Sequence, residues 1–187
     1  DSTITIDNVM QDTSEFTLFS RSNIAFSDTV KLNDKNGLDY EWKFYPRDLH
    51  GTIPFPSIKD GLISIFKWYQ MENVDKINLF ETSKEDLFGI IRYREEKLKT
   101  HFGYAVQPYP EELFNMSGYM KMDMDQMEKA KMYFEFCIEF YPNSANSYDS
   151  MADYYERNGD YVNAIKFMIK AYEISGENSY KERIEVL

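Results

Sequence analysis

The side chains best suited to chemistry in this chain are two histidines and one cysteine. His50 stands before Gly51 in a polar loop spanning 47–57. A neutral imidazole can take up a proton from one group and return it to another, so His50 is a candidate for acid–base chemistry. On residue type alone, an ordinary loop histidine remains the alternative. His101 stands alone near the end of a predicted helix. There it is expected to be a polar residue that interacts favourably with the helix C-terminus.

Metal and disulfide chemistry are not predicted. The only cysteine, Cys137, excludes an internal disulfide, and we expect it in the core. The two histidines are far apart in sequence and lack a paired carboxylate pattern, so they do not suggest a metal site. The acidic triplet Asp123-Met124-Asp125 lacks the following glycine and terminal glutamate of a calcium loop, and we predict a turn there. No cofactor is expected.

A single strand is predicted in the first third of the chain. Residues 38–45, LDYEWKFY, alternate apolar or aromatic residues with charged ones, which is typical of a half-buried strand. Helices are predicted on either side, over 14–33 and 58–69, from apolar residues spaced three and four apart. One strand cannot satisfy its own hydrogen-bonding groups. Its partners are therefore expected in a sheet outside this sequence or in a second copy, as a homodimer through 38–45.

The second half of the chain repeats itself. Residues 111–144 recur at 145–178, so that Ala130 corresponds to Ala164. A repeat of this length is typical of a solenoid built from two-helix units, and the predicted class is mainly α. Helices are predicted over 84–101, near 111–122, 126–141, 145–157 and 161–175, and, as the start of a capping helix, over 180–186.

This repeat pattern resembles the tetratricopeptide repeat. The second copy carries the sharper match, including Tyr148, Ala152, Gly159, Ala164 and Ala171. The resemblance implies a module that binds a peptide or protein partner or that supports a neighbouring domain. Six methionines fall within 116–132, and they suit either an adaptable peptide groove or a repeat core filled with flexible side chains.

Charge limits the partners that the chain can bind. Its formal net charge is −11, which excludes the basic footprint that nucleic-acid binding needs. Residues 71–187 contribute −8 of this charge. A solvated helical surface is the expected cause, and a basic partner is the alternative. No apolar run approaches the roughly 18 residues that a membrane span requires.

The loop that contains His50 carries a second resemblance. This part of the sequence resembles bacterial α/β-hydrolase serine esterases related to the siderophore-ester hydrolases. The resemblance lies in Tyr45-Pro46, then His50-Gly51, then a predicted helix with Asp60-Gly61-Leu62. Some of these esterases carry tetratricopeptide repeats after the hydrolase domain. The resemblance implies that His50 is the triad general base of a parent enzyme acting on a carboxylic ester. Related esterases are often exported, but the sequence does not give the compartment of this protein.

The same resemblance implies what the chain lacks. No Gly-x-Ser-x-Gly occurs in it, so the nucleophile is expected upstream of Asp1, and the chain alone is expected to be inactive. The expected organisation is a hydrolase segment over 1–70, a linker with an amphipathic helix over 71–110, and repeats with a capping helix over 111–187. The alternative function is an adaptor without catalysis, whose repeats bind a peptide.

Overall fold

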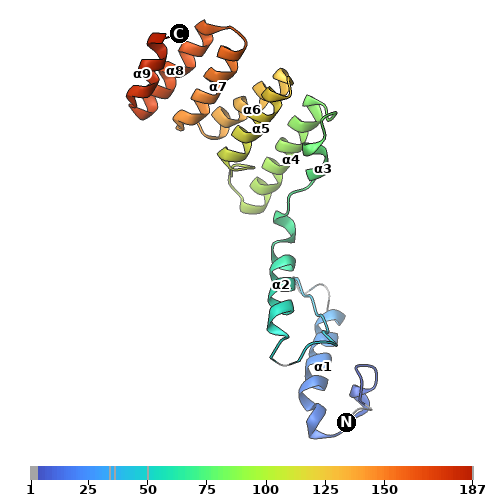
Figure 1. Ribbon diagram of the computed structural model, residues 1–187. Helices are drawn as coiled ribbons and strands as arrows, with labels where there is room; N and C mark the ends of the chain where they lie inside the picture. Colours follow the sequence, from blue (N-terminus) through green and yellow to red (C-terminus); the bar gives the residue numbers. More distant parts are fainter. Residues whose placement is uncertain (1–3, 34, 36, 50, 187) are drawn as a thin grey trace. The chain divides into compact units, whose positions relative to one another are not determined.

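The computed structural model describes residues 4–33, 35, 37–49 and 51–186 and divides into two compact units, Asp1–Gln70 (unit 1) and Met71–Leu187 (unit 2). Both are helical (Figure 1). The α-helices are α1 (Leu18–Leu32), α2 (Pro54–Ile65), α3 (Val74–Asn78), α4 (Lys84–Phe102), α5 (Glu111–Asp123), α6 (Met127–Phe140), α7 (Ala145–Arg157), α8 (Tyr161–Ser175) and α9 (Asn178–Val186). Short 3₁₀ turns are Val9–Gln11, Glu15–Thr17 and Lys67–Tyr69.

The predicted strand at 38–45 is wrong, because the described residues of the chain contain no strand. The segment instead contacts α2 through its side chains. The Tyr45 hydroxyl donates to Asp60 Oδ2 at 2.8 Å, and Lys43 forms an ion pair with the same carboxylate. Alternating aromatic residues suit a sheet only where a neighbouring strand supplies the ladder. A homodimer was predicted because a lone strand at 38–45 would need a partner strand. Since no strand forms there, nothing in this segment supports a homodimer.

The helix after the His50 loop begins earlier than predicted. The predicted polar loop extends to residue 57, but Pro54 opens α2. Proline suits the first turn of a helix because its fixed φ is helical and its missing N–H has no partner there. The predicted end at residue 69 also shifts, because α2 ends at Ile65 and a 3₁₀ turn follows.

Unit 1 leaves most of its large apolar side chains exposed. Among its described residues, those that are buried are Val9, Thr17 and Ser27, and of these only Val9 is apolar. Helix α2 buries none of its residues. Ile58, Leu62 and Ile65, the predicted apolar side of that helix, are all more than half exposed.

Unit 2 contains the helical pairs that the repeat predicts. Helices α5 and α6 form one pair, and α7 and α8 form the next (Figure 1). The amphipathic helix predicted at 84–101 is α4, whose first turn is capped by the Ser83 hydroxyl accepting from the Asp86 N–H at 3.0 Å. The predicted linker over 71–110 also contains, before α4, the five-residue helix α3.

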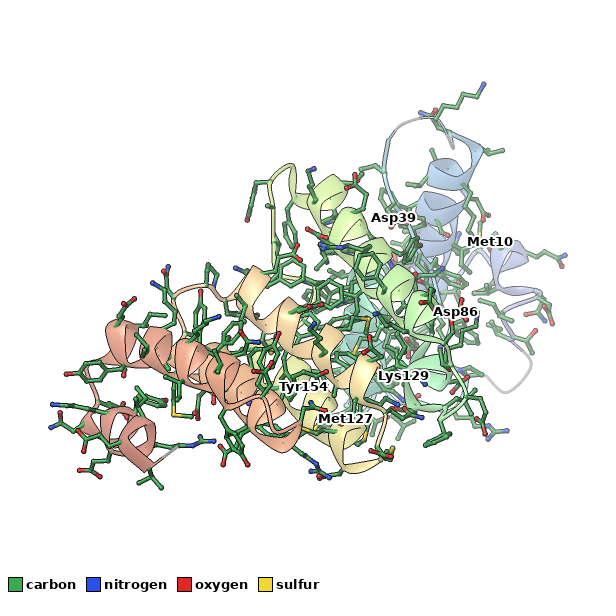
Figure 2. The ribbon with its side chains drawn as sticks, turned by 90° about the horizontal axis from the view of Figure 1, so that it is seen from above. Met10, Asp39, Asp86, Met127, Lys129 and Tyr154 are labelled. Atoms are coloured by element: carbon green, nitrogen blue, oxygen red, sulfur yellow. The ribbon has the colours of Figure 1, made fainter. Side chains whose placement is uncertain are left out.

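Two apolar clusters hold unit 2 together. The first joins α4, α5 and α6 around Leu87, Phe114 and Phe136. The second joins α5, α6 and α7 around Phe134, Met151 and Tyr154, and the partly buried Met127 of α6 packs against it (Figure 2). Each cluster spans more than one helical pair, so the pairs stabilise one another as in a solenoid. Among the described residues, no helix is long and apolar enough to cross a membrane.

Candidate functional site

Three polar contacts in unit 2 join residues that lie one repeat length apart in the sequence. Tyr119 on α5 contacts Asp153 on α7, and Asp123 pairs with Arg157 at 2.8 Å. Asp149 on α7 contacts a residue of α9, Arg183, at 3.0 Å. Equivalent positions on the first helix of each repeat therefore face one another across the stack. Helix α9 follows α7 at nearly the repeat spacing, so it takes the place of the first helix of a further unit.

These contacts lie beside an open hollow, which we call the polar groove. Its volume is about 510 Å³. The groove is lined by Tyr119, Met122, Asp123, Asp153, Glu156, Arg157, Tyr161 and Arg183. Charged and aromatic side chains of α5, α7 and α9 and of the start of α8 thus gather around one hollow.

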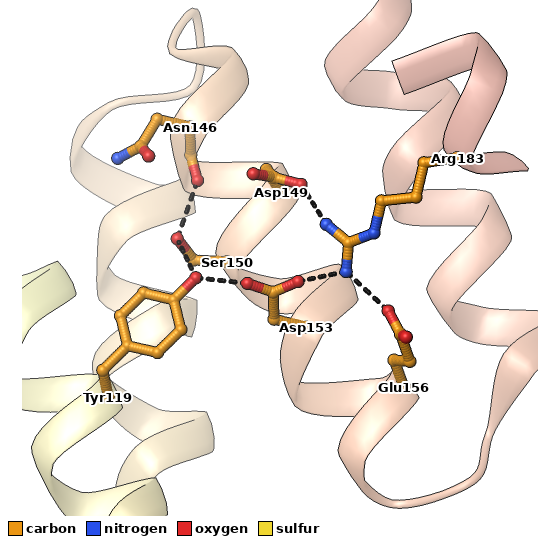
Figure 3. Close-up of polar contacts among 7 residues, drawn as sticks. All are labelled: Tyr119, Asn146, Asp149, Ser150, Asp153, Glu156 and Arg183. Carbon is orange, nitrogen blue, oxygen red and sulfur yellow. Dashed lines mark hydrogen bonds and ion pairs between the residues drawn. The ribbon is translucent and has the colours of Figure 1, made fainter. Parts of the chain in front are cut away.

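Arg183 lies among three carboxylates of α7 (Figure 3). Its Nη1 donates to Asp149 Oδ1 at 3.0 Å, and its Nη2 donates both to Asp153 and to Glu156 Oε2, the latter at 2.5 Å. Burial alone would lower the pKa of Arg183, but the hydrogen bonds that its guanidinium donates to Glu156 and Asp153 outweigh burial, and the pKa is raised. The guanidinium carries one positive charge and the three carboxylates carry three negative charges, so this cluster has a net negative charge.

Asp153 lies at the centre of this network, with each oxygen engaged by a different helix (Figure 3). The Tyr119 hydroxyl donates to Asp153 Oδ2 at 2.6 Å and also contacts Ser150 Oγ at 3.3 Å. Arg183 donates to the other oxygen. Burial, followed by the hydrogen bond to Asp153, raises the pKa of Tyr119, so its proton is retained at neutral pH.

The starts of α5 and α7 are tied together at the opposite end of the same helices. Glu111 Oε1 accepts from Ser144 Oγ at 2.6 Å, Ser147 Oγ at 3.0 Å and Asn146 Nδ2 at 3.1 Å. A carboxylate near helix N-termini is favoured by the free backbone N–H groups there. With both ends fixed, the two helices hold the polar groove in register.

The residues singled out in the sequence have different surroundings where the structure describes them. His50 lies outside the described residues. The prediction that Cys137 is a core residue is confirmed, because its side chain is fully buried, and burial followed by the Glu111 charge raises the thiol pKa to about 12. His101 packs edge-on against Phe102 near the end of α4. In the part of the chain that the structure describes, no group of three or more metal-ligating side chains is arranged to hold an ion.

The triplet at 123–125 is a turn, as predicted. Asp123 ends α5, and Asp125 takes a left-handed conformation with φ of 59°. Asp123 also pairs with Arg157, which the sequence reasoning did not foresee. The signal was present, because opposite charges recur at the spacing of the repeat, both here and at Asp149 and Arg183.

The comparisons with known proteins agree with this arrangement of helices. The tetratricopeptide-repeat model matches residues 111–144 and 145–178. No curated protein matches the chain. The chain therefore contains two tetratricopeptide repeats, corresponding to α5–α6 and α7–α8, and these repeats support a protein-interaction module.

Proposed function

We propose that the polar groove binds a basic peptide segment of a partner protein. The observation that carries this proposal is the arrangement of Asp149, Asp153 and Glu156 around a single guanidinium. The net charge of −8 on residues 71–187 points to the same partner chemistry, because an acidic surface attracts basic segments.

Arg183 serves as an internal example of the ligand. Its guanidinium donates to three carboxylates from one helix, so the spacing of those carboxylates already suits an arginine side chain. Glu156 also borders the open hollow. An incoming arginine or lysine is expected to share Glu156 and Asp153 with Arg183, or to replace Arg183 when α9 moves.

The test measures binding of a labelled peptide of alternating arginine and alanine to the full chain by fluorescence anisotropy. Glu156→Gln is expected to weaken binding about tenfold, which corresponds to about 1.4 kcal/mol. The matched control is Glu173→Gln, which removes the same charge from α8, where Glu173 pairs with Lys170 away from the groove. Affinity is expected to fall as salt rises.

Two outcomes would contradict this function. In the first, Glu173→Gln weakens binding as much as Glu156→Gln, which would mean that only overall charge matters. In the second, a peptide with glutamate in place of arginine binds equally well.

We also propose that residues 1–70 are part of a serine esterase domain in the full-length protein, with His50 as its general base. The resemblance of the 45–62 text supports this proposal. So does α2, whose apolar side at Ile58, Leu62 and Ile65 is more than half exposed, as expected of a helix that packs on a sheet in a larger domain. The ion pair and hydrogen bond at Asp60 connect the segments before and after the His50 loop.

The esterase proposal is tested by hydrolysis of p-nitrophenyl esters by the full-length protein, by this chain and by a full-length His50→Ala variant. Activity is expected in the full-length protein alone. Activity in the present chain would refute the prediction that its nucleophile lies elsewhere. Full activity after His50→Ala would remove His50 from the mechanism.

A further inference from the structure

Beside the polar groove, α5 borders a second hollow of different character, which we call the apolar notch. Its volume is about 270 Å³. The notch is lined by Met71, Val74, Ile77, Asn78, Ile91, Tyr109, Leu113, Phe114, Met116, Ser117, Met120 and Tyr133. These residues come from α3 and the segment before it, from α4 and the segment after it, and from α5 and α6.

The repeat shows what normally covers this surface of α5. Met116 and Met120 correspond to Ser150 and Tyr154, one repeat length later on α7. Ser150 is 1% exposed and Tyr154 is 7% exposed, because α5 and α6 pack over them. Met116 is 61% exposed and Met120 is 36% exposed. The same face is therefore covered in the second repeat and uncovered in the first.

The cause is the shortness of α3. Helices α5 and α7 have 13 residues each, whereas α3, which precedes α4 as α5 precedes α6, has five. One turn of helix supplies Val74 and Ile77 to the notch and leaves the rest of the α5 face open. The open face presents Leu113, Met116 and Met120, which are spaced three and four residues apart around the small Ser117.

We infer that the apolar notch binds an amphipathic helix from a partner protein, seated on α5 as α5 is seated on α7. The occupant is expected to carry large apolar side chains at positions i, i+3 and i+7, matching the pitch of the α5 face. Unbranched methionine side chains adapt readily to such a helix. Its flanks are expected to carry lysine or arginine, because residues 71–187 have a net charge of −8.

The methionines within 116–132 differ in burial and in what they contact. Met122 and Met132 are buried in the apolar clusters, as expected of core residues. Met116 and Met120 line the notch. Met124, also exposed, lies at the end of α5 outside the notch and provides a matched control.

The test uses two labelled helical peptides of leucine, alanine and lysine with identical composition. One carries its leucines at i, i+3 and i+7, and the other has them spread around the helix. The striped peptide is expected to bind the full chain and to gain helicity on binding, as measured by fluorescence anisotropy and circular dichroism. The double variant Met116→Gln, Met120→Gln is expected to weaken its binding at least about tenfold, which corresponds to about 1.4 kcal/mol.

The control variant Met124→Gln is expected to change the affinity by less than about twofold, which is within the usual effect of a surface substitution. Equal weakening by Met124→Gln would overturn the proposal, as would equal binding of both peptides or no binding of either. A dimer of the full chain in sedimentation that the double variant abolishes would show that a second copy is the occupant instead. Glu156→Gln is expected to change the affinity for the striped peptide by less than about threefold. Failure of the helix-binding proposal can therefore be distinguished from failure of the proposal that the polar groove binds a basic peptide.

Discussion

A Cβ atom on Gly118 would overlap the ring of Phe134. Gly118 lies on α5 and Phe134 lies on α6, and Phe134 is fully buried. In the second repeat the equivalent residues are Ala152 and Met168, both also fully buried. The two repeats thus close the same contact in different ways, with the smallest residue against an aromatic ring in one and alanine against a flexible thioether in the other.

Gly118→Ala is expected to lower the free energy of unfolding by about 1–3 kcal/mol, because the added methyl group overpacks a rigid ring. Adding Phe134→Met reproduces the pair of the second repeat and is expected to recover part of that loss. Urea denaturation followed by circular dichroism measures both changes.

The control for this prediction is Gly89→Ala on α4, where a Cβ would meet nothing within 4 Å. That change is expected to be neutral or to stabilise by up to about 1 kcal/mol, since alanine favours helix over glycine. A Gly118→Ala variant as stable as the wild type would show that the helices separate without cost.

The repeat half of the fold was predictable because the recurrence of 111–144 at 145–178 fixes the helix order and the small residues at contacts such as Ala130 and Ala164. The segment at 38–45 was not predictable from its alternation. Whether such a segment becomes a strand depends on a partner for its backbone, and local sequence does not report that partner. Here Tyr45 and Lys43 find Asp60 on α2 instead.

The polar groove was only partly predictable. Opposite charges lie one repeat length apart at Asp123 and Arg157 and at Asp149 and Arg183. Both ion pairs could therefore have been predicted from sequence alone. The predicted capping helix continues the repeat spacing, so that Arg183 follows Asp149 by 34 residues. The apolar notch could not be foreseen, because it depends on α3 being a single short helix within a segment that shows no lasting periodicity.

Asp149→Asn is expected to make stability less dependent on pH. Burial, and then the neighbouring Asp153, raise the pKa of Asp149 despite Arg183. A carboxyl whose pKa is higher in the folded state favours folding when protonated. Its contribution is present below the unfolded pKa of about 3.9 and is lost as pH rises through the folded pKa. Asparagine resembles the protonated form at every pH.

The urea midpoint of Asp149→Asn relative to wild type is therefore expected to rise between pH 4 and pH 7. Arg183 keeps Asp153 and Glu156 as partners in the variant, so its charge remains compensated. A midpoint that falls relative to wild type over the same range would show that the pair with Arg183 outweighs the cost of burial.

The Cys137 thiol is expected to resist modification in the folded chain. Burial raises its pKa to about 12, so almost none of the reactive thiolate is present at pH 8. Reaction with a chromogenic disulfide reagent is expected to be complete in urea and at least about a hundredfold slower in buffer, since it then requires opening of unit 2. Rapid labelling in buffer would show that α6 separates readily from its neighbours.

Arg92→Lys is expected to destabilise unit 2 although it preserves the charge. Arg92 on α4 donates to both oxygens of Glu139 on α6, at 2.6 and 2.7 Å, and its guanidinium lies 4.9 Å from the ring centroid of Phe136 and 5.1 Å from that of Phe88. A lysine ammonium cannot reproduce the bidentate geometry or the contact of a planar, delocalised cation with the rings. Because Arg92 is partly exposed, the expected loss is only about 1 kcal/mol.

Arg157→Lys provides the matched control, since Arg157 makes a single 2.8 Å contact with Asp123 at a more exposed site. Its effect on the free energy of unfolding is expected to stay within about 0.5 kcal/mol. Urea denaturation of both variants at low and at high salt separates the two contributions, because salt screens the ion pair but leaves the contact with the rings largely intact. Equal losses at Arg92 and Arg157 would show that the contact with the aromatic rings adds nothing to the ion pair.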